Sequence, residues 1–202
     1  MERKNIIIKK ISIYSLILIT ILLTYLSYHL YKENQYFKIE MGSKYRDTVV
    51  STLYQIKEND INFWVETLQN EEDGDVLLER YIGNLNVLVK GYDDMDDHIR
   101  IFAIQIRHLS EQYRDLDSNI DKGKDTEIHK EKISRNIRFI RDVLTQVQSD
   151  LGDESEILWY KELSNSETKT VKYIWTEFKN FEKENKWLFQ LNEYSTRVIW
   201  QT

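Results

Sequence analysis

Residues 95–120 read MDDHIRIFAIQIRHLSEQYRDLDSNI and carry apolar side chains at alternating intervals of four and three residues. These positions are Met95, Ile99, Phe102, Ile106, Leu109, Tyr113, Leu116 and Ile120. Residues 133–151 repeat the spacing with Ile133, Ile137, Ile140, Leu144, Val147 and Leu151. Such spacing puts an apolar seam along one face of an α-helix, which packs at about +20° against a neighbouring helix. The two seams predict an all-α fold with coiled-coil packing.

The flanking segments show the same periodicity with more interruptions. We predict helices over residues 45–68, 76–90, 154–163 and 166–199, the first of which can continue directly out of a preceding apolar segment. In the last of these helices, Asn185 occupies a seam position between Phe181 and Leu188. A polar seam residue sets register or oligomeric state at some cost in stability.

Glycine marks the expected breaks between helices. Four of the six glycines stand between periodic segments, where a left-handed C-terminal cap costs little: Gly74, Gly91, Gly123 and Gly152. Ser164 and Glu167 form a capping-box pattern that predicts a helix start near Asn165. The chain contains no proline, which suits long helices. We therefore predict that residues 31–202 form an elongated antiparallel bundle of four long helices and one or two short ones.

Residues 11–30, ISIYSLILITILLTYLSYHL, predict a transmembrane helix. They contain no Lys, Arg, Asp or Glu, and eleven of the twenty are Ile or Leu. At roughly −0.3 to −0.6 kcal/mol each on an insertion scale, these eleven contribute about −3 to −7 kcal/mol. A helix of this length also matches a hydrocarbon core of about 30 Å.

The residues around this span indicate an uncleaved signal anchor and its orientation. No A-x-A-like cleavage pattern follows the span; Tyr25, Tyr28 and Tyr31 stand there instead and suit the membrane interface. The preceding tail, residues 1–10, carries four basic residues and one acid. The positive-inside rule then predicts a short basic cytoplasmic tail and a single-pass protein of the cell membrane, with residues 31–202 outside.

Composition and motifs argue against several classes of function. A formal charge of −6 gives no support to nucleic-acid binding, and the absence of cysteine excludes disulfides, thiolate metal sites and a cysteine nucleophile. The sequence has no glycine-rich phosphate loop, no G-x-S-x-G and no H-E-x-x-H. We expect no catalytic residues and no cofactor, so the protein is not expected to be an enzyme.

Two polar patterns and one aromatic residue are candidates for binding. Asp94, Asp97 and His98 belong to an acidic run that could hold a cation, although acids at a helix start also match its dipole. Arg100, Arg107 and Arg114 recur every seven residues and form one stripe, which either engages an acidic partner or pairs with nearby acids. Exposed aromatic residues are enriched at protein interfaces. Trp159 and Trp200 do not fall clearly on an apolar seam, and we take Trp200 as the candidate for contact with a partner.

Two functional hypotheses follow from these features. The first is a membrane-anchored helical interaction module, a scaffold, adaptor or accessory subunit that binds another membrane or envelope protein. The alternative is an extracytoplasmic ligand-binding or sensory helical bundle without its own output domain. In architecture alone, the plan resembles the sensory four-helix domains of bacterial receptors. Self-association through the 95–120 seam is also possible, and the pattern leaves open whether the C-terminus returns to the membrane.

Overall fold

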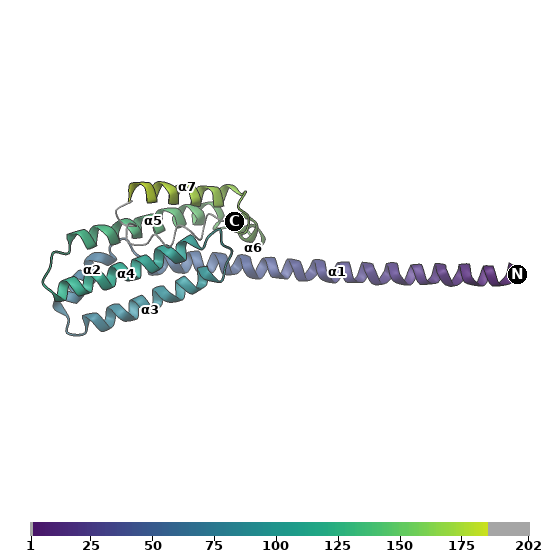
Figure 1. Ribbon diagram of the computed structural model, residues 1–202, viewed down its shortest axis with the longest axis horizontal. Coiled ribbons are helices and arrows are strands. Elements are labelled where there is room, and N and C mark those ends of the chain that lie inside the picture. The colour runs from purple at the N-terminus through teal and green to yellow at the C-terminus, as the bar shows by residue number, and fades with distance from the viewer. Residues whose placement is uncertain (1, 186–202) are drawn as a thin grey trace.

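The computed structural model describes residues 2–185, and side chains from residue 14 onward. This part of the chain forms seven α-helices and no strand, so the prediction of an all-α fold is confirmed. The helices are α1 (Glu2–Gln55), α2 (Asp60–Asn70), α3 (Gly74–Asp93), α4 (Ile101–Asp121), α5 (Glu127–Leu151), α6 (Glu156–Leu163) and α7 (Lys169–Glu184). α1 projects as a long rod from the group that the other six helices form (Figure 1).

α1 joins two chemically different segments without a break. Its N-terminal part includes a stretch long and apolar enough to cross a membrane, none of which is buried within the structure. In that stretch the hydroxyls of Thr20 and Thr24 donate to backbone carbonyl oxygens one turn earlier, both at 2.9 Å, so they cost little in an apolar environment. Burial then begins at Gly42 and recurs every three or four residues, as an amphipathic helix requires.

The two predicted seams form the core of the packed region, residues 42–185, which we call the helical body. α4 contacts both α3 and α5, and α5 contacts α1 and α7; Figure 1 shows α3, α4, α5 and α7 side by side. Ile106, Leu109, Tyr113 and Leu116 of the first seam are completely buried, as are Ile133, Ile137 and Ile140 of the second. Each fully buried Ile or Leu side chain contributes about 1.5–3 kcal/mol. Because the 95–120 seam is buried inside the chain, it offers no surface to a second copy.

Two predicted helices have different limits in the structure. α4 begins at Ile101, later than the first seam position, although Met95 and Ile99 are still buried in the preceding turns. The helix predicted over residues 45–68 is interrupted after Gln55 and resumes at Asp60 as α2. There the Asp60 carboxylate accepts a hydrogen bond from the backbone N–H of Lys57 at 2.9 Å. Such local side-chain bonds compete with continuation of a helix.

Two further predicted helices are confirmed, and one predicted cap is wrong. α3 and α6 match the helices predicted over 76–90 and 154–163 within a few residues. The capping box at Ser164 and Glu167 is wrong, because Thr168 caps α7 by accepting a hydrogen bond from the N–H of Val171 at 3.3 Å. Asn165 instead accepts from the N–H of Glu167 in a local turn. The part of the 166–199 helix beyond residue 185 lies outside the described residues.

The predicted left-handed caps are confirmed at one glycine of four. Gly123 has φ +61° directly after α4, and it is the only residue with positive φ among those described. Gly74 is the first residue of α3, Gly91 lies inside α3, and Gly152 has φ −54°. At Gly91 an added Cβ would lie 3.2 Å from the Thr48 side chain of α1, which is a tight contact.

The closest helix crossing occurs at Gly42, where α6 contacts α1. A Cβ placed on Gly42 would lie 1.7 Å from the backbone carbonyl oxygen of Glu156, which no side chain can tolerate. Beside it, Arg46 Nη1 donates to Glu156 Oε1 at 2.8 Å, and the ring of Tyr160 packs against that of Tyr45 with centroids 6.5 Å apart. α6 is thereby held on α1 at the end of the helical body from which the apolar rod projects (Figure 1).

Replacing Gly42 by alanine tests this crossing. We expect Gly42→Ala to separate α6 from α1 and to cost about 2–3 kcal/mol, which is typical of overpacking. The matched control is Gly83→Ala, in the exposed middle of α3, where an added Cβ has nothing within 4 Å. Glycine is a poor helix former, so this control should be stabilised by about 0.5–1 kcal/mol. Thermal unfolding of the full chain in detergent, followed by circular dichroism, should shift in opposite directions; a parallel shift contradicts the crossing.

Candidate functional site

The arginine stripe is engaged in ion pairs within the chain. Asp97 pairs with Arg100 at 2.8 Å, Asp93 pairs with Arg107, and Glu79 of α3 pairs with Arg114. The Glu79 pair is two-pronged, with Nε and Nη2 of Arg114 at 2.9 and 3.2 Å from the two carboxylate oxygens, and it lowers the pKa of Glu79. All three arginine side chains remain 45–49% exposed, so a partner can still reach them.

Two residues of the acidic run at the start of the first seam contact α1, and a third forms a local ion pair. Asp94 lies 3.7 Å from Lys44 of α1, Asp97 binds Arg100, and Asp96 accepts a hydrogen bond from the hydroxyl of Tyr45. His98 is half-buried beside them. Within the described side chains, no three His, Asp or Glu residues converge into a set that could hold a metal.

The two tryptophans left unplaced by the sequence have different outcomes. Trp159 of α6 is completely buried and belongs to the core. Trp200, the aromatic residue predicted to bind a partner, lies outside the residues that the structure describes. The C-terminus, which was predicted either to return to the membrane or to point away from it, also lies outside them.

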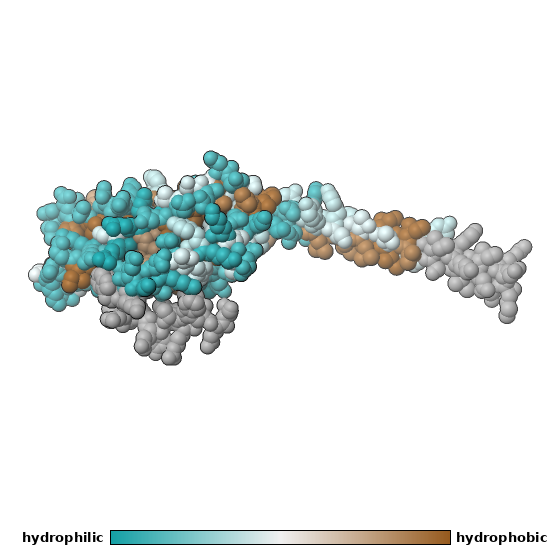
Figure 2. All heavy atoms as spheres, turned by 90° about the horizontal axis from the view of Figure 1, so that it is seen from above, coloured by the Kyte–Doolittle hydropathy of each residue, from teal (hydrophilic) through white to brown (hydrophobic). Residues whose placement is uncertain are grey.

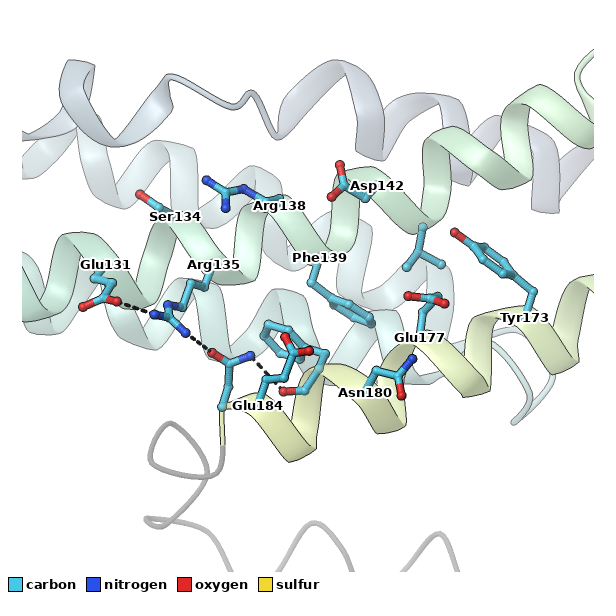
Figure 3. A pocket seen from close by; sticks show the side chains of 13 residues that line it. Glu131, Ser134, Arg135, Arg138, Phe139, Asp142, Tyr173, Glu177, Asn180 and Glu184 are labelled. Atoms are coloured by element: carbon cyan, nitrogen blue, oxygen red, sulfur yellow. Dashed lines mark hydrogen bonds and ion pairs between the residues drawn. The ribbon is translucent and has the colours of Figure 1, made fainter.

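The structure reveals a groove that the sequence patterns did not predict. It lies between α5 and α7 and has a volume of about 660 Å³ (Figure 3). Two nearly buried aromatic rings, Phe139 and Phe181, stack with centroids 4.5 Å apart at its apolar part. The charged residues lining it carry both signs and are Glu131, Arg135, Arg138, Asp142, Glu177 and Glu184. A groove with an apolar part and charges of both signs suits a peptide, a helix edge or an organic ligand.

One end of the groove is closed by a hydrogen-bonded chain of side chains. Glu131 pairs with Arg135 at 2.5 Å, and Arg135 Nη1 donates to the side-chain oxygen of Asn185 at 3.0 Å (Figure 3). The amide nitrogen of Asn185 donates in turn to the backbone carbonyl oxygen of Phe181 at 2.8 Å. Asn185 therefore ends α7 and ties it to α5, which gives this polar seam residue a role within the chain.

The groove was missed because its walls come from two segments far apart in sequence. Phe139 directly precedes Ile140 of the second seam but does not itself belong to that seam. An apolar residue beside a complete seam indicates a second contact face on the same helix. That signal was present, although nothing in the pattern showed that α7 would supply the other wall.

Three of four phenols in or beside the core are hydrogen-bonded to side chains of other helices or turns. Burial raises the pKa of Tyr45, Tyr81, Tyr92 and Tyr113 above its ordinary range. Three of them have identified partners: Asp96 for Tyr45, Asp60 for Tyr81 and Thr52 for Tyr92. A phenol that stays protonated at neutral pH is a poor nucleophile or base, so these residues support the fold.

Comparisons with protein-family models, with curated proteins and with solved structures give no match for this chain.

The half-buried His108 on α4 should make stability depend on pH. Burial lowers its pKa from 6.5, so below that pH the unfolded chain binds a proton more readily than the folded chain. The free energy of unfolding therefore has its full value above pH 6.5 and decreases as the pH falls toward the lower pKa of the folded chain. The slope of this decrease is at most about 1.4 kcal/mol per pH unit. Urea unfolding of the full chain in detergent between pH 7.5 and 5.5 should show this loss. His108→Gln should remove it, and curves that stay parallel contradict the assignment.

Proposed function

We propose that the protein is a membrane-anchored helical interaction module, a scaffold, adaptor or accessory subunit that binds another membrane or envelope protein. The observation that carries the proposal is the continuity of α1 from its exposed apolar segment into the core. Only residues 31–41 separate the predicted span from the helical body, which is about 16 Å of helix. A body mounted in this way stands close to the bilayer, where it can meet other membrane proteins.

The proposed topology follows the sequence argument. Residues 11–30 cross the lipid bilayer, residues 1–10 lie in the cytoplasm, and residues 31–202 form an antiparallel bundle outside. The basic tail supports this orientation through the positive-inside rule. No catalytic group or cofactor is part of the proposal.

The groove between α5 and α7 is the surface that best suits a protein partner. Charges of both signs surround the apolar part of the groove and select a partner whose charges are complementary. A partner with a different charge pattern would leave charged residues of the groove unpaired. Arg100, Arg107 and Arg114 remain candidates for a second contact, since each is about half exposed despite its internal ion pair.

The same groove also suits the alternative function, a ligand-binding or sensory helical bundle. Its volume of about 660 Å³ lies within the range of about 300–1,000 Å³ that small-molecule sites occupy. A ligand-binding or sensory bundle would hold an organic molecule against Phe139 and Phe181. A ligand that fills this groove should raise the unfolding temperature of the full chain in detergent. An interaction module that binds a protein partner should not need such a ligand.

Single-cysteine labelling tests the proposed topology, because the natural chain contains no cysteine. Asn84→Cys, on the exposed face of α3, should react with a membrane-impermeant maleimide on intact cells. Asn5→Cys, in the basic tail, should react only after the membrane is permeabilised. Labelling of Asn5→Cys on intact cells would reverse the topology and place the helical body in the cytoplasm.

Photo-crosslinking in intact cells tests the partner surface. A photoreactive residue in place of Arg138, an exposed residue of the groove, should give a discrete adduct with one membrane or envelope protein. The same residue in place of Arg80, exposed on α3, is the control. The charge reversal Glu177→Lys on the opposite wall should weaken the adduct, because the partner's complementary charge is then repelled. Identical products from both positions, or an adduct insensitive to Glu177→Lys, exclude the groove as the partner surface.

A further inference from the structure

We infer that the groove between α5 and α7 selects a basic amphipathic helix of the partner protein, whose Lys or Arg side chains lie between Asp142 and Glu177. The inference rests on the proposed function and adds the chemistry of the partner to it. It depends on three features of the groove, which are its unpaired charges, its nearly buried apolar floor and its length.

The charged residues of the groove are not balanced within the chain. Glu131 and Arg135 form an ion pair, and Arg135 also donates to the side chain of Asn185. Among the side chains that the structure describes, the other charged residues of the lining form no ion pair; they are Arg138, Asp142, Glu177 and Glu184. Three acids therefore stand against one arginine, so the unpaired groups of the groove are predominantly negative and favour a cationic partner.

Arg138 does not neutralise Asp142, although the two residues stand four positions apart on α5. On a helix, such a pair is more favourable when the acid precedes the base, and here the order is reversed. Even where exposed pairs of this kind form, they contribute little to stability. A cation from the partner can therefore take the place beside Asp142, and Arg138 stays available to an acid of the partner.

Asp142 and Glu177 make one end of the groove acidic. Asp142 lies on α5 and Glu177 on α7, so an incoming side chain meets a carboxylate on either wall (Figure 3). Tyr173, one turn before Glu177, is affected by both: burial raises its pKa, and the charges of Glu177, Asp142 and Asp150 raise it further. A Lys or Arg side chain that enters here also lies near the Tyr173 ring, whose face attracts cations.

The apolar floor of the groove provides little selectivity by itself. Phe139 and Phe181 are only 7% and 8% exposed, and Val143 beside them is 2% exposed. Figure 2, which views the helical body from the side of α7, shows a mainly hydrophilic surface. The partner gains limited apolar contact, so charge decides which partner binds. It needs few apolar residues and complementary charges, which is the composition of a basic amphipathic helix.

The length of the groove favours a helix over a single small cation. Its lining runs from Glu131 to Val143 on α5 and from Tyr173 to Asn185 on α7. Each wall is therefore about 18 Å long, which corresponds to about three helical turns. α5 and α7 lie side by side in Figure 1, and a helix of the partner can lie along the groove between them. A lone ammonium group would occupy only the acidic end.

Photo-crosslinking of the full chain in native membranes tests the inference. The photoreactive residue replaces Asn180, which is exposed and uncharged and lines the groove, so every groove charge is kept. Neutralising the acidic end with Asp142→Asn and Glu177→Gln should lower the yield of the partner adduct at least about fivefold, because two charge pairs are lost. The control, Glu66→Gln with Glu72→Gln, removes the same charge from exposed positions on and just after α2 and should leave the yield unchanged.

A charge exchange tests the chemistry of the partner directly. Mass spectrometry of the adduct should place the attachment on a segment with Lys or Arg at spacings of three or four residues, which is the spacing of one helix face. Changing its nearest basic residue to Glu should reduce the adduct, and Glu177→Lys in this chain should restore it. Restoration requires that the two residues face each other, which an effect on folding alone would not produce.

The contrary outcomes separate the inference from the proposed function. An adduct that is insensitive to Asp142→Asn with Glu177→Gln, or an attached segment without basic residues, overturns the inference and leaves the interaction module unaffected. No partner adduct from either Asn180 or Arg138 removes the groove from both proposals. A crosslink to residues 186–202 of the same chain, or to a second copy, assigns the groove to that occupant and overturns the inference as well.

Discussion

The structure depends on one helix that must satisfy two different environments. α1 has all its interior backbone hydrogen bonds within itself, which is the condition for crossing a bilayer. The same helix becomes amphipathic at Gly42 and supplies Tyr45 and Val49 to the core, and Ile56, directly after its last residue, is also buried there. No proline interrupts the segment between these two parts. The position of the helical body relative to the apolar segment is consequently set by the helix itself and not by a flexible linker.

The contact between α6 and α1 then determines which face of α1 remains accessible. The backbones of α1 and α6 approach too closely at Gly42 for any side chain, and the Arg46–Glu156 pair and the Tyr45–Tyr160 contact lie beside this crossing. The partly exposed ion pair adds little by itself, about 0–1 kcal/mol. Steric fit is therefore the stronger constraint, and it leaves the same face of α1 open from the apolar segment to Tyr54.

Local periodicity predicted the helices well, whereas contacts between distant segments were beyond its reach. The seams at 95–120 and 133–151 were readable because burial of one helix face repeats every three or four residues. Three of the four predicted glycine caps were wrong, and at Gly91 the sequence could not show that a helix passes nearby, where an added Cβ would lie 3.2 Å from Thr48. The groove between α5 and α7 was missed for the same reason. Of the arginine stripe, Arg107 and Arg114 lie on α4 and Arg100 directly precedes it, and the partner of Arg114 is Glu79 of α3.

The surface proposed for a partner differs from the arginine stripe, whose side chains are each paired with an acid of the same chain. The groove between α5 and α7 combines stacked phenylalanines with charges of both signs, which discriminate among partners that diffuse in from any direction. Those charges lie on α5 and α7, whereas the arginine stripe lies on and just before α4, so the two surfaces share no side chain.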